Sequence, residues 1–310
     1  MTTASAPGKI ILFGEHAVVH GRPALAAPVT QVAAVARVTE SSRPGVWIEA
    51  PDIGIADELS QLAEDLPLAT IVRGVLAAIK LDSHPSLTLQ VTSTIPVASG
   101  LGSGTAVSVA VIRALSTHLG KPLDDERVNA LAYETEKLYH GAPSGIDNTV
   151  ITYARPVYFI KGKPIEPLQV GQPFTLVIGD TGIRAPTKES ISAVRSLWEA
   201  DKPRWEAVFD RAAAIARQAR TCIEAGEIQS LGGLMDANHA LLQEMTVSSP
   251  KLDRLVVAAR RSGALGAKLS GSGRGGNMIA LVRKEDASRI SQDLLDAGAS
   301  QALVTTISPA

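Results

Sequence analysis

The sequence predicts an α+β fold divided into two domains, and three observations predict it. The chain has 310 residues, which is more than one average domain and about the length of two. Stretches typical of strands dominate the first third of the chain, and helix-forming stretches follow directly after them. Strands and helices mix again toward the C-terminus, and their mixture in both halves is typical of an α+β or mixed α/β protein.

Apolar, β-branched runs predict the early strands. These runs are "KIILF", "VTQVAAVARV", "GVWIEA" and "SLTLQVTSTI". Helical periodicity predicts one inserted helix around Leu66–Lys80, then helices at Thr105–Leu119 and Asp125–Leu138, with Gly141 ending the last of them. Short strands are expected near "NTVITY" and "PVYFI".

Prolines in "KGKPIEPLQVGQP" predict a domain boundary, because Pro164 and Pro167 interrupt regular structure there. We therefore expect an N-terminal domain over residues 1–165 and a C-terminal domain over residues 166–310. The C-terminal half is expected to contain the strand "FTLVIGD", four helices and the glycine-rich stretch "GALGAKLSGSGRGGNMIALV". A helix near Ala287–Ala297 and the strand "QALVTTI" complete it.

Composition excludes several classes of protein. Hydrophobic residues make up 45% and charged residues 20% of the chain, as in ordinary globular proteins. The formal net charge of −1 provides no basic field for nucleic acid or an anionic membrane. Cys222 is the single cysteine, so no intrachain disulfide or cysteine-rich zinc site is expected. Neither a signal peptide nor a membrane span is expected, so the prediction is a cytoplasmic protein.

The stretch "PVASGLGSGTAVSV" suggests a phosphate-binding loop at the start of a helix. Gly100, Gly102 and Gly104 would let backbone N–H groups converge on an anion at the helix N-terminus. Ser103 and Thr105 add hydroxyls that either cap the helix or reach a metal. The alternative is a tight turn needed only for packing. Walker A is excluded, since GxxxxGK[ST] does not occur in the chain.

A second glycine cluster, "SGSGRGGN", matches G-x-G-x-x-G at Gly271, Gly273 and Gly276. It does not fit a dinucleotide fingerprint, because "NMIALV" continues it as a strand instead of a helix. The protein-kinase motifs "HRD" and "DFG" are absent as well. The cluster is either a second loop that approaches phosphate or a simple turn.

Two further stretches carry charged residues in unusual places. In "APGKIILFGEHAVVHG", Lys9 enters an apolar strand, where it has either a specific partner or a solvated head at the strand edge. A zinc pair of His16 and His20 is not expected, because HExxH is absent. In "EKLYHGAPSGIDN", Glu136 lies near a helix end and Asp147 in a loop. Two such carboxylates can hold a cation and take a proton, or be an ordinary helix-face and turn pair.

In this order, the four stretches resemble the GHMP kinases, which include galacto-, homoserine, mevalonate and phosphomevalonate kinases. The resemblance covers nearly the whole chain. It implies a ribosomal-S5-like N-terminal domain, a ferredoxin-like C-terminal domain and a cleft between them that holds ATP and Mg²⁺. "APGKIILFGEHAVVHG" and "HGAPSGIDN" are similar to the members acting on mevalonate. They imply ATP-dependent phosphorylation of the mevalonate 5-hydroxyl, giving 5-phosphomevalonate and ADP.

The resemblance also implies roles for individual residues. Asp147 would take the proton of the 5-hydroxyl, Lys9 would sit beside it and stabilise developing charge, and Glu136 would bind Mg²⁺. Acceptor binding is carried over to Glu15, His16, Ser144, Thr181 and Gly273. Nucleotide binding is carried over to Asp52, Ser93, Gly100, Leu101, Gly102, Ser103, Gly104 and Thr105.

Two departures from the family pattern matter. Family members have an Asn near the nucleotide base where this chain has Asp52, which removes an amide donor. They also have a second loop serine, a Mg²⁺ ligand, where this chain has Gly104. We expect Thr105, Ser103 or a water to replace that ligand. The sequence does not indicate the oligomeric state, and a homodimer is kept as a candidate.

Related activities remain open as alternatives. Arg184 and Lys188 near Thr181 keep a phosphorylated acceptor under consideration, and phosphorylation of the 3-hydroxyl is another candidate. A silent ligand sensor on the same fold is less favoured, because Asp147 and Glu136 are both present.

Overall fold

The computed structural model describes residues 1–81, 85–96, 100–140 and 143–309. Val97–Ser99 of the first glycine cluster, and Gly141 as the expected helix end, lie outside the described residues. The chain forms two compact units. The first comprises Met1–Gly8, Val29–Val97 and Gly102–Ala154, and the second comprises Lys9–Pro28, Ala98–Leu101 and Arg155–Ala310. The expected domain boundary at residues 165/166 stays a prediction.

The first unit contains strands in the order β4-β3-β5-β2. Strand β5 is antiparallel to β2 and parallel to β3, and β3 is antiparallel to β4. Val38 of β2 pairs with Leu89 of β5, and both side chains are fully buried. The long strand β1 also pairs with β2. The bounds are β1 Thr2–Phe13, β2 Ala24–Glu40, β3 Val46–Ala50, β4 Ile55–Glu58 and β5 Leu87–Ser93.

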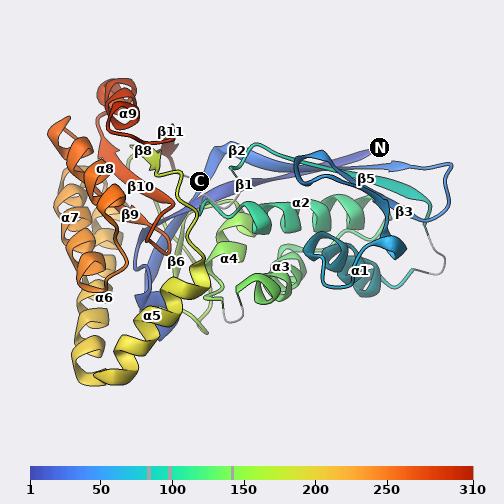
Figure 1. Cartoon of the computed structure of the whole chain (residues 1–310), viewed down its shortest axis with the longest axis horizontal. Coiled ribbons are helices and arrows are strands. Elements are labelled where there is room, and N and C mark those ends of the chain that lie inside the picture. Colours follow the sequence, from blue (N-terminus) through green and yellow to red (C-terminus); the bar gives the residue numbers. More distant parts are fainter. Residues whose placement is uncertain (82–84, 97–99, 141–142, 310) are drawn as a thin grey trace. The chain divides into compact units, whose positions relative to one another are not determined.

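Helices α1, α2, α3 and α4 of the first unit lie on the same side of these strands (Figure 1). The three helices expected from periodicity are confirmed, with ends shifted by one or two residues. The expected strand at "NTVITY" is wrong, because this stretch belongs to α4. Its β-branched residues favour strands locally, but Gly145 turns the chain and Thr149 donates its hydroxyl back to the Gly145 carbonyl at 2.7 Å. The bounds are α1 Pro67–Ile79, α2 Ser103–His118, α3 Asp125–His140 and α4 Ile146–Tyr153.

The second unit is built on a four-stranded antiparallel sheet in the order β11-β8-β10-β9. The strands and helices expected from the sequence are confirmed here. The four strands of this sheet are β8 Phe174–Asp180, β9 Gly266–Ser270, β10 Asn277–Val282 and β11 Gln301–Ile307. Two short strands outside this sheet also belong to the unit, β6 Val157–Phe159 and β7 Glu166–Pro167. The helices are α5 Thr187–Ala200, α6 Lys202–Ala225, α7 Ile228–Glu244, α8 Pro250–Arg261 and α9 Ala287–Asp296. Short 3₁₀ turns span Ala17–His20, Pro51–Ile53, Leu59–Gln61 and Lys284–Asp286.

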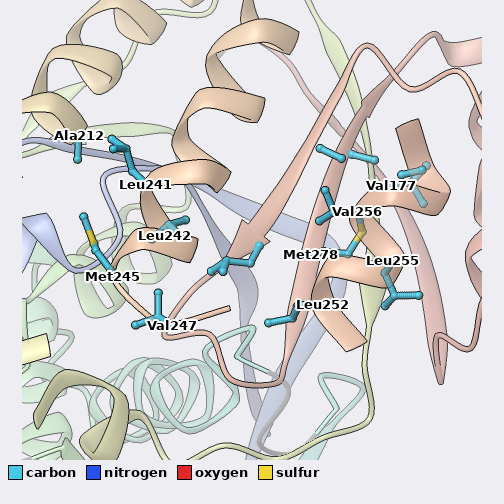
Figure 2. Packing of buried hydrophobic residues seen from close by; sticks show 14 of the residues in the cluster. Val177, Ala212, Leu241, Leu242, Met245, Val247, Leu252, Leu255, Val256 and Met278 are labelled. Atoms are coloured by element: carbon cyan, nitrogen blue, oxygen red, sulfur yellow. The ribbon is translucent and has the colours of Figure 1, made fainter. Parts of the chain in front are cut away.

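The core of the second unit joins this sheet to its helices. Figure 2 shows Leu252 and Val256 of α8 beside Met278 of β10. Leu242 of α7 and Val247 after it extend the same cluster, and all five side chains are at most 1% exposed. Each fully buried Leu or Val stabilises the fold by about 1.5–3 kcal/mol, so this cluster fixes where the end of α7 and the start of α8 lie.

On the outer edge of β9, side chains make the backbone hydrogen bonds that a neighbouring strand would otherwise make. Ala267 and Leu269 point their N–H and C=O groups away from β10, and an edge strand ordinarily leaves such groups open. Here all four are paired, which holds β9 in place up to the residue where the glycine cluster begins. Ala267 N donates to Asp236 Oδ1 at 3.0 Å, and Ala267 O accepts from Arg260 Nη2 at 2.8 Å. Leu269 N donates to His239 Nδ1 at 3.3 Å, and Leu269 O accepts from Lys268 Nζ at 2.6 Å.

Candidate active site

The expected site residues fall in both units. The first unit contains Asp52, Ser93, Gly102, Ser103, Gly104, Thr105, Glu136, Ser144 and Asp147. The second contains Lys9, Glu15, His16, Gly100, Leu101, Thr181 and Gly273.

The first glycine cluster leads directly into α2. Gly100 and Gly102 have positive φ angles of 85° and 76°, which glycine adopts without strain. Gly102 is the N-cap of α2 and no side chain caps it, so the capping alternative for the hydroxyls of Ser103 and Thr105 is wrong. The first intrahelical bond runs from Ala106 N to Gly102 O at 2.9 Å. The N–H groups before it have no intrahelical partner and point out of the helix start, which favours an anion there.

Thr105 and Glu136 form a buried polar pair in the first unit. The Thr105 hydroxyl donates a hydrogen bond to Glu136 Oε1, and the two residues are 7% and 4% exposed. Glu136 is therefore a buried carboxylate of α3 that faces α2, not an ordinary solvated helix-face residue. The pair presents carboxylate and hydroxyl oxygens, the ligand types that Mg²⁺ takes, next to an anion-favouring helix start. The donor set thus fits a magnesium ion.

Asp147 lies in the first turn of α4, not in a loop as expected. Gly145, with φ 92°, is the N-cap of this helix, and no side chain caps it. The N-terminal end of a helix carries partial positive charge, so an acidic side chain is favourably placed in this first turn. The Ser144 hydroxyl accepts a hydrogen bond from Ile146 N at 3.4 Å and so helps to shape the turn. Asp147 is half-buried at this helix start.

Asp52 and Ser93, both expected on the nucleotide side, lie together in the first unit. Asp52 Oδ2 accepts a hydrogen bond from Ser93 N at 2.9 Å. The Ser93 hydroxyl in turn accepts one from Ile95 N at 3.1 Å. One carboxylate oxygen of Asp52 therefore helps to fix the end of β5. This contact requires only an acceptor oxygen, which Asp and Asn side chains both have.

Lys9 lies inside β1 and is 4% exposed. The alternative of a solvated head at the strand edge is therefore wrong. Its backbone N donates to Leu101 O at 2.9 Å, so the strand and the glycine cluster are joined by a main-chain bond. Two residues further, both backbone groups of Ile11 bond to the Ser270 hydroxyl, at 3.1 Å and 2.8 Å.

His16 is a buried, neutral histidine in a strained conformation. Its φ is 59°, a left-handed value that is costly for a residue with a side chain. Its Nε2 lies 3.0 Å from the Ser272 carbonyl, which only accepts, so Nε2 carries the hydrogen. Burial lowers the pKa of His16 to about 4, and the Ser272 bond opposes this shift. At neutral pH the ring is therefore uncharged, and Nδ1 is its acceptor.

Each carboxylate oxygen of Glu15 has its own partner inside the protein. Lys268 forms an ion pair with Oε1, and Asn238 Nδ2 donates to Oε2 at 3.2 Å. The side chains of Glu15 and Lys268 are both 0% exposed. Burial lowers the pKa of Lys268, whereas the charge of Glu15 raises it.

The second glycine cluster packs against the chain's own backbone. A Cβ at Gly273 would lie 2.0 Å from Val247 O, and one at Gly275 would lie 2.4 Å from Ile183 O. These two glycines are therefore needed for close packing. Thr181 supports the cluster as well, because its hydroxyl donates to Gly276 O at 2.9 Å and accepts from Ile183 N at 3.2 Å. Gly271 has open space around its Cβ position.

Sequence reasoning missed Lys268 and Asn238, although one signal was available. Lys268 interrupts the apolar stretch "GALGAKLS" directly before a glycine cluster, the same pattern that drew attention to Lys9. Asn238 gives no such signal, because polar residues are common on helices. Within the described parts of the chain, no three His, Cys, Asp or Glu side chains gather as a metal site.

Comparisons with known proteins assign the chain to a class. The family described as "GHMP kinases N terminal domain" matches residues 69–155, and "GHMP kinases C terminal" matches residues 219–300. The chain belongs to the GHMP kinase family, and such kinases use ATP.

Within that family, the chain is similar to mevalonate kinases. That of Pyrococcus horikoshii is 38% identical over 90% of this chain and 88% of its own length. That of Thermococcus gammatolerans is 36% identical over 98% and 96%. The crystal structure of L. major mevalonate kinase in complex with R-mevalonate covers 100% of this chain and 97% of its own, with a TM-score of 0.87 and 31% identity. No helix in the described ranges is long and apolar enough to cross a membrane.

Proposed function

We propose that this chain transfers the γ-phosphate of ATP to the 5-hydroxyl of mevalonate, giving 5-phosphomevalonate and ADP. The observation that carries this proposal is the similarity to mevalonate kinases at 36–38% identity over nearly the full length. The oxygen pair of Thr105 and Glu136 beside the start of α2 supports it, because phosphoryl transfer requires charge neutralisation next to the phosphates.

In the proposed reaction, Asp147 accepts the proton of the mevalonate 5-hydroxyl. The hydroxyl oxygen then forms a bond to the γ-phosphorus, the bond to the bridging oxygen breaks, and ADP leaves. Lys9 stabilises the negative charge that develops on the attacking oxygen and the phosphoryl group. The first-turn position of Asp147 supports its role, because the turn at Gly145 and the start of α4 fix where its carboxylate lies.

Nucleotide binding is assigned to the start of α2 and to the residues before it. The N–H groups of the first turn, with Gly100, Leu101, Gly102, Ser103 and Gly104 leading into it, hold the phosphates. Asp52 and Ser93 lie on the side of the base. A magnesium ion would be held by Glu136 together with Thr105 or Ser103, and it would supply charge neutralisation at the phosphates.

Acceptor binding is assigned to His16, Ser144, Thr181 and Gly273, and Glu15, which directly precedes His16, is assigned to the same group. The neutral ring of His16 offers an acceptor at Nδ1, which suits a substrate hydroxyl. A cytoplasmic location and a homodimer belong to the same proposal and stay predictions.

A panel of acceptors tests the proposal. The purified chain is incubated with ATP, Mg²⁺ and either mevalonate or phosphomevalonate, and ADP release is measured. Phosphorus NMR of the product separates the 5-phosphate from the 3-phosphate. Exclusive turnover of phosphomevalonate would favour the exposed Arg184 and Lys188 as phosphate ligands instead. No turnover of any acceptor would contradict the proposal and favour a ligand sensor.

A further inference from the structure

Lys268 is a buried cation to which neither the proposed chemistry nor the sequence analysis gives a role. It lies in β9 and is 0% exposed. Its Nζ donates to Glu15 Oε1 and, at 2.6 Å, to the Leu269 carbonyl. It also lies 6.0 Å from the centre of the Phe13 ring. One ammonium group thus joins the end of β1, the turn after it and the edge of β9.

Stability alone is a weak reason for such a pair. Removing two charges from water is costly, and well-packed apolar side chains often stabilise a core at least as well. Where a protein keeps a buried ion pair, fixing one arrangement of the chain is an alternative reason.

Both members of the pair are next to parts of the candidate site. Glu15 directly precedes His16, whose φ of 59° is strained and needs support from its surroundings. Lys268 precedes the glycine cluster by two residues, and Ser272 of that cluster accepts the hydrogen bond of His16 Nε2. Asn238 of α7 holds the second oxygen of Glu15 at 3.2 Å, which fixes the rotation of the carboxylate.

We infer that Lys268 is a positioning residue for the acceptor substrate. Through Glu15 it holds the strained His16 against the Ser272 carbonyl, so that the ring keeps its hydrogen on Nε2 and presents Nδ1 to the substrate. The inference rests on the proposed function for the identity of that substrate. It gives Glu15 an indirect role, because both carboxylate oxygens already have partners inside the protein.

The test separates positioning from mere stability. Lys268→Met leaves the Glu15 charge buried beside Asn238 alone, and we expect a large loss of melting temperature. The double variant Glu15→Gln/Lys268→Met removes both charges, and we expect it to recover most of that loss. Its KM for mevalonate should nevertheless stay raised by about tenfold or more, because a small misplacement of a binding group has large effects. Its KM for ATP should stay within about twofold of the wild type.

Lys163→Met, at an exposed lysine of the same unit, is the matched control and should change neither constant. A double variant with recovered melting temperature and a wild-type KM for mevalonate would overturn the inference. An equal rise of both KM values would also overturn it, because that result indicates general loosening of the fold.

A second readout does not depend on turnover. Nitrogen–proton correlation spectra of the histidine rings, with His16 assigned by His16→Gln, report which ring nitrogen carries the hydrogen. We expect a single Nε2–H form of His16 in the wild type and a mixture of both forms in the double variant. An unchanged Nε2–H form would sink the inference, whatever the substrate. Failure of the proposed function alone would instead appear as a wild-type protein that does not turn over mevalonate.

Discussion

The hydroxyl of Thr105 on α2 donates to the carboxylate of Glu136 on α3, in a buried contact between helices. The residue before Thr105 is Gly104, which has no side-chain ligand to offer a metal. Thr105, in the first turn of α2, contacts the proposed magnesium ligand Glu136 through its side chain. This relationship favours Thr105 over Ser103 as the replacement for the serine of the family pattern.

Thr105→Ala is expected to raise the Mg²⁺ concentration needed for half-maximal activity by about tenfold. Removal of a metal ligand, or of a side chain that contacts one, typically weakens metal binding by at least that factor. Thr105→Ser keeps the hydroxyl and should stay near the wild type. The measurement is a Mg²⁺ titration of ADP release at fixed free ATP. Ser116→Ala, which removes another buried hydroxyl of α2, is the control. An identical Mg²⁺ requirement in Thr105→Ala would remove Thr105 from the metal site.

Asp147→Asn is expected to lower kcat by about 10²–10⁴-fold, the usual contribution of a general base. The amide has nearly the same shape as the carboxylate, so the fold and the nucleotide site should be unaffected. ADP release measures kcat, and equilibrium binding of a non-hydrolysable ATP analogue measures the nucleotide affinity. A variant that keeps a tenth or more of the wild-type kcat would exclude Asp147 as the base.

Stability is expected to fall between pH 6.5 and pH 4 because two histidines are buried as neutral rings. Burial lowers the pKa of His16 and of His239 to about 4, from 6.5. In this window the unfolded chain binds protons that the folded chain does not, so the free energy of unfolding decreases as the pH falls. Each ring should account for roughly 2 kcal/mol between pH 7 and pH 5.

Urea midpoints at pH 7, 6 and 5 check this expectation. His239→Gln should flatten the dependence by about the share of one ring, since glutamine carries no titrating group. If the variant and the wild type lost the same free energy over this range, His239 would not be the source.

Gly232→Ala should destabilise the second unit by about 3 kcal/mol or more, because backbone would have to move. A Cβ there would lie 2.0 Å from the Leu265 carbonyl oxygen, where α7 crosses the start of β9. Gly233→Ala is the matched control, since its Cβ would meet nothing within 4 Å. In a helix, that substitution should stabilise by up to about 1 kcal/mol. Urea unfolding of both variants measures the difference, and equal effects would refute the packing argument.

Periodicity predicted most elements of the fold, because apolar faces and caps are local properties of the sequence. The strand β8 at Phe174–Asp180 and the helix α9 from Ala287 follow directly from such patterns. The stretch that forms α4 could not be assigned this way. Its β-branched residues favour a strand. The stretch nevertheless forms a helix, because the chain turns at Gly145 and the helix is buried on nearly all sides. Such tertiary effects have no local signature.

A buried charge could be anticipated where residue type and neighbourhood are unusual, as with Lys9 in an apolar strand. The partners of Glu15 were not predictable. Lys268 is 253 residues away from it in sequence, and no spacing rule connects the two. The packing role of Gly273 was equally hidden, because it depends on the carbonyl of Val247 approaching from another part of the chain.

The pairing of Ala267 and Leu269 with side chains has a consequence for how this protein behaves at high concentration. A bare edge strand templates the addition of strands from other molecules, which is a common route to aggregation. Here a second molecule would first have to displace Asp236, Arg260, His239 and Lys268 from their contacts. The side chains that hold β9 therefore also prevent it from pairing with a strand of a second molecule. The backbone amides of Ala267 and Leu269 should exchange with solvent as slowly as those of an interior strand.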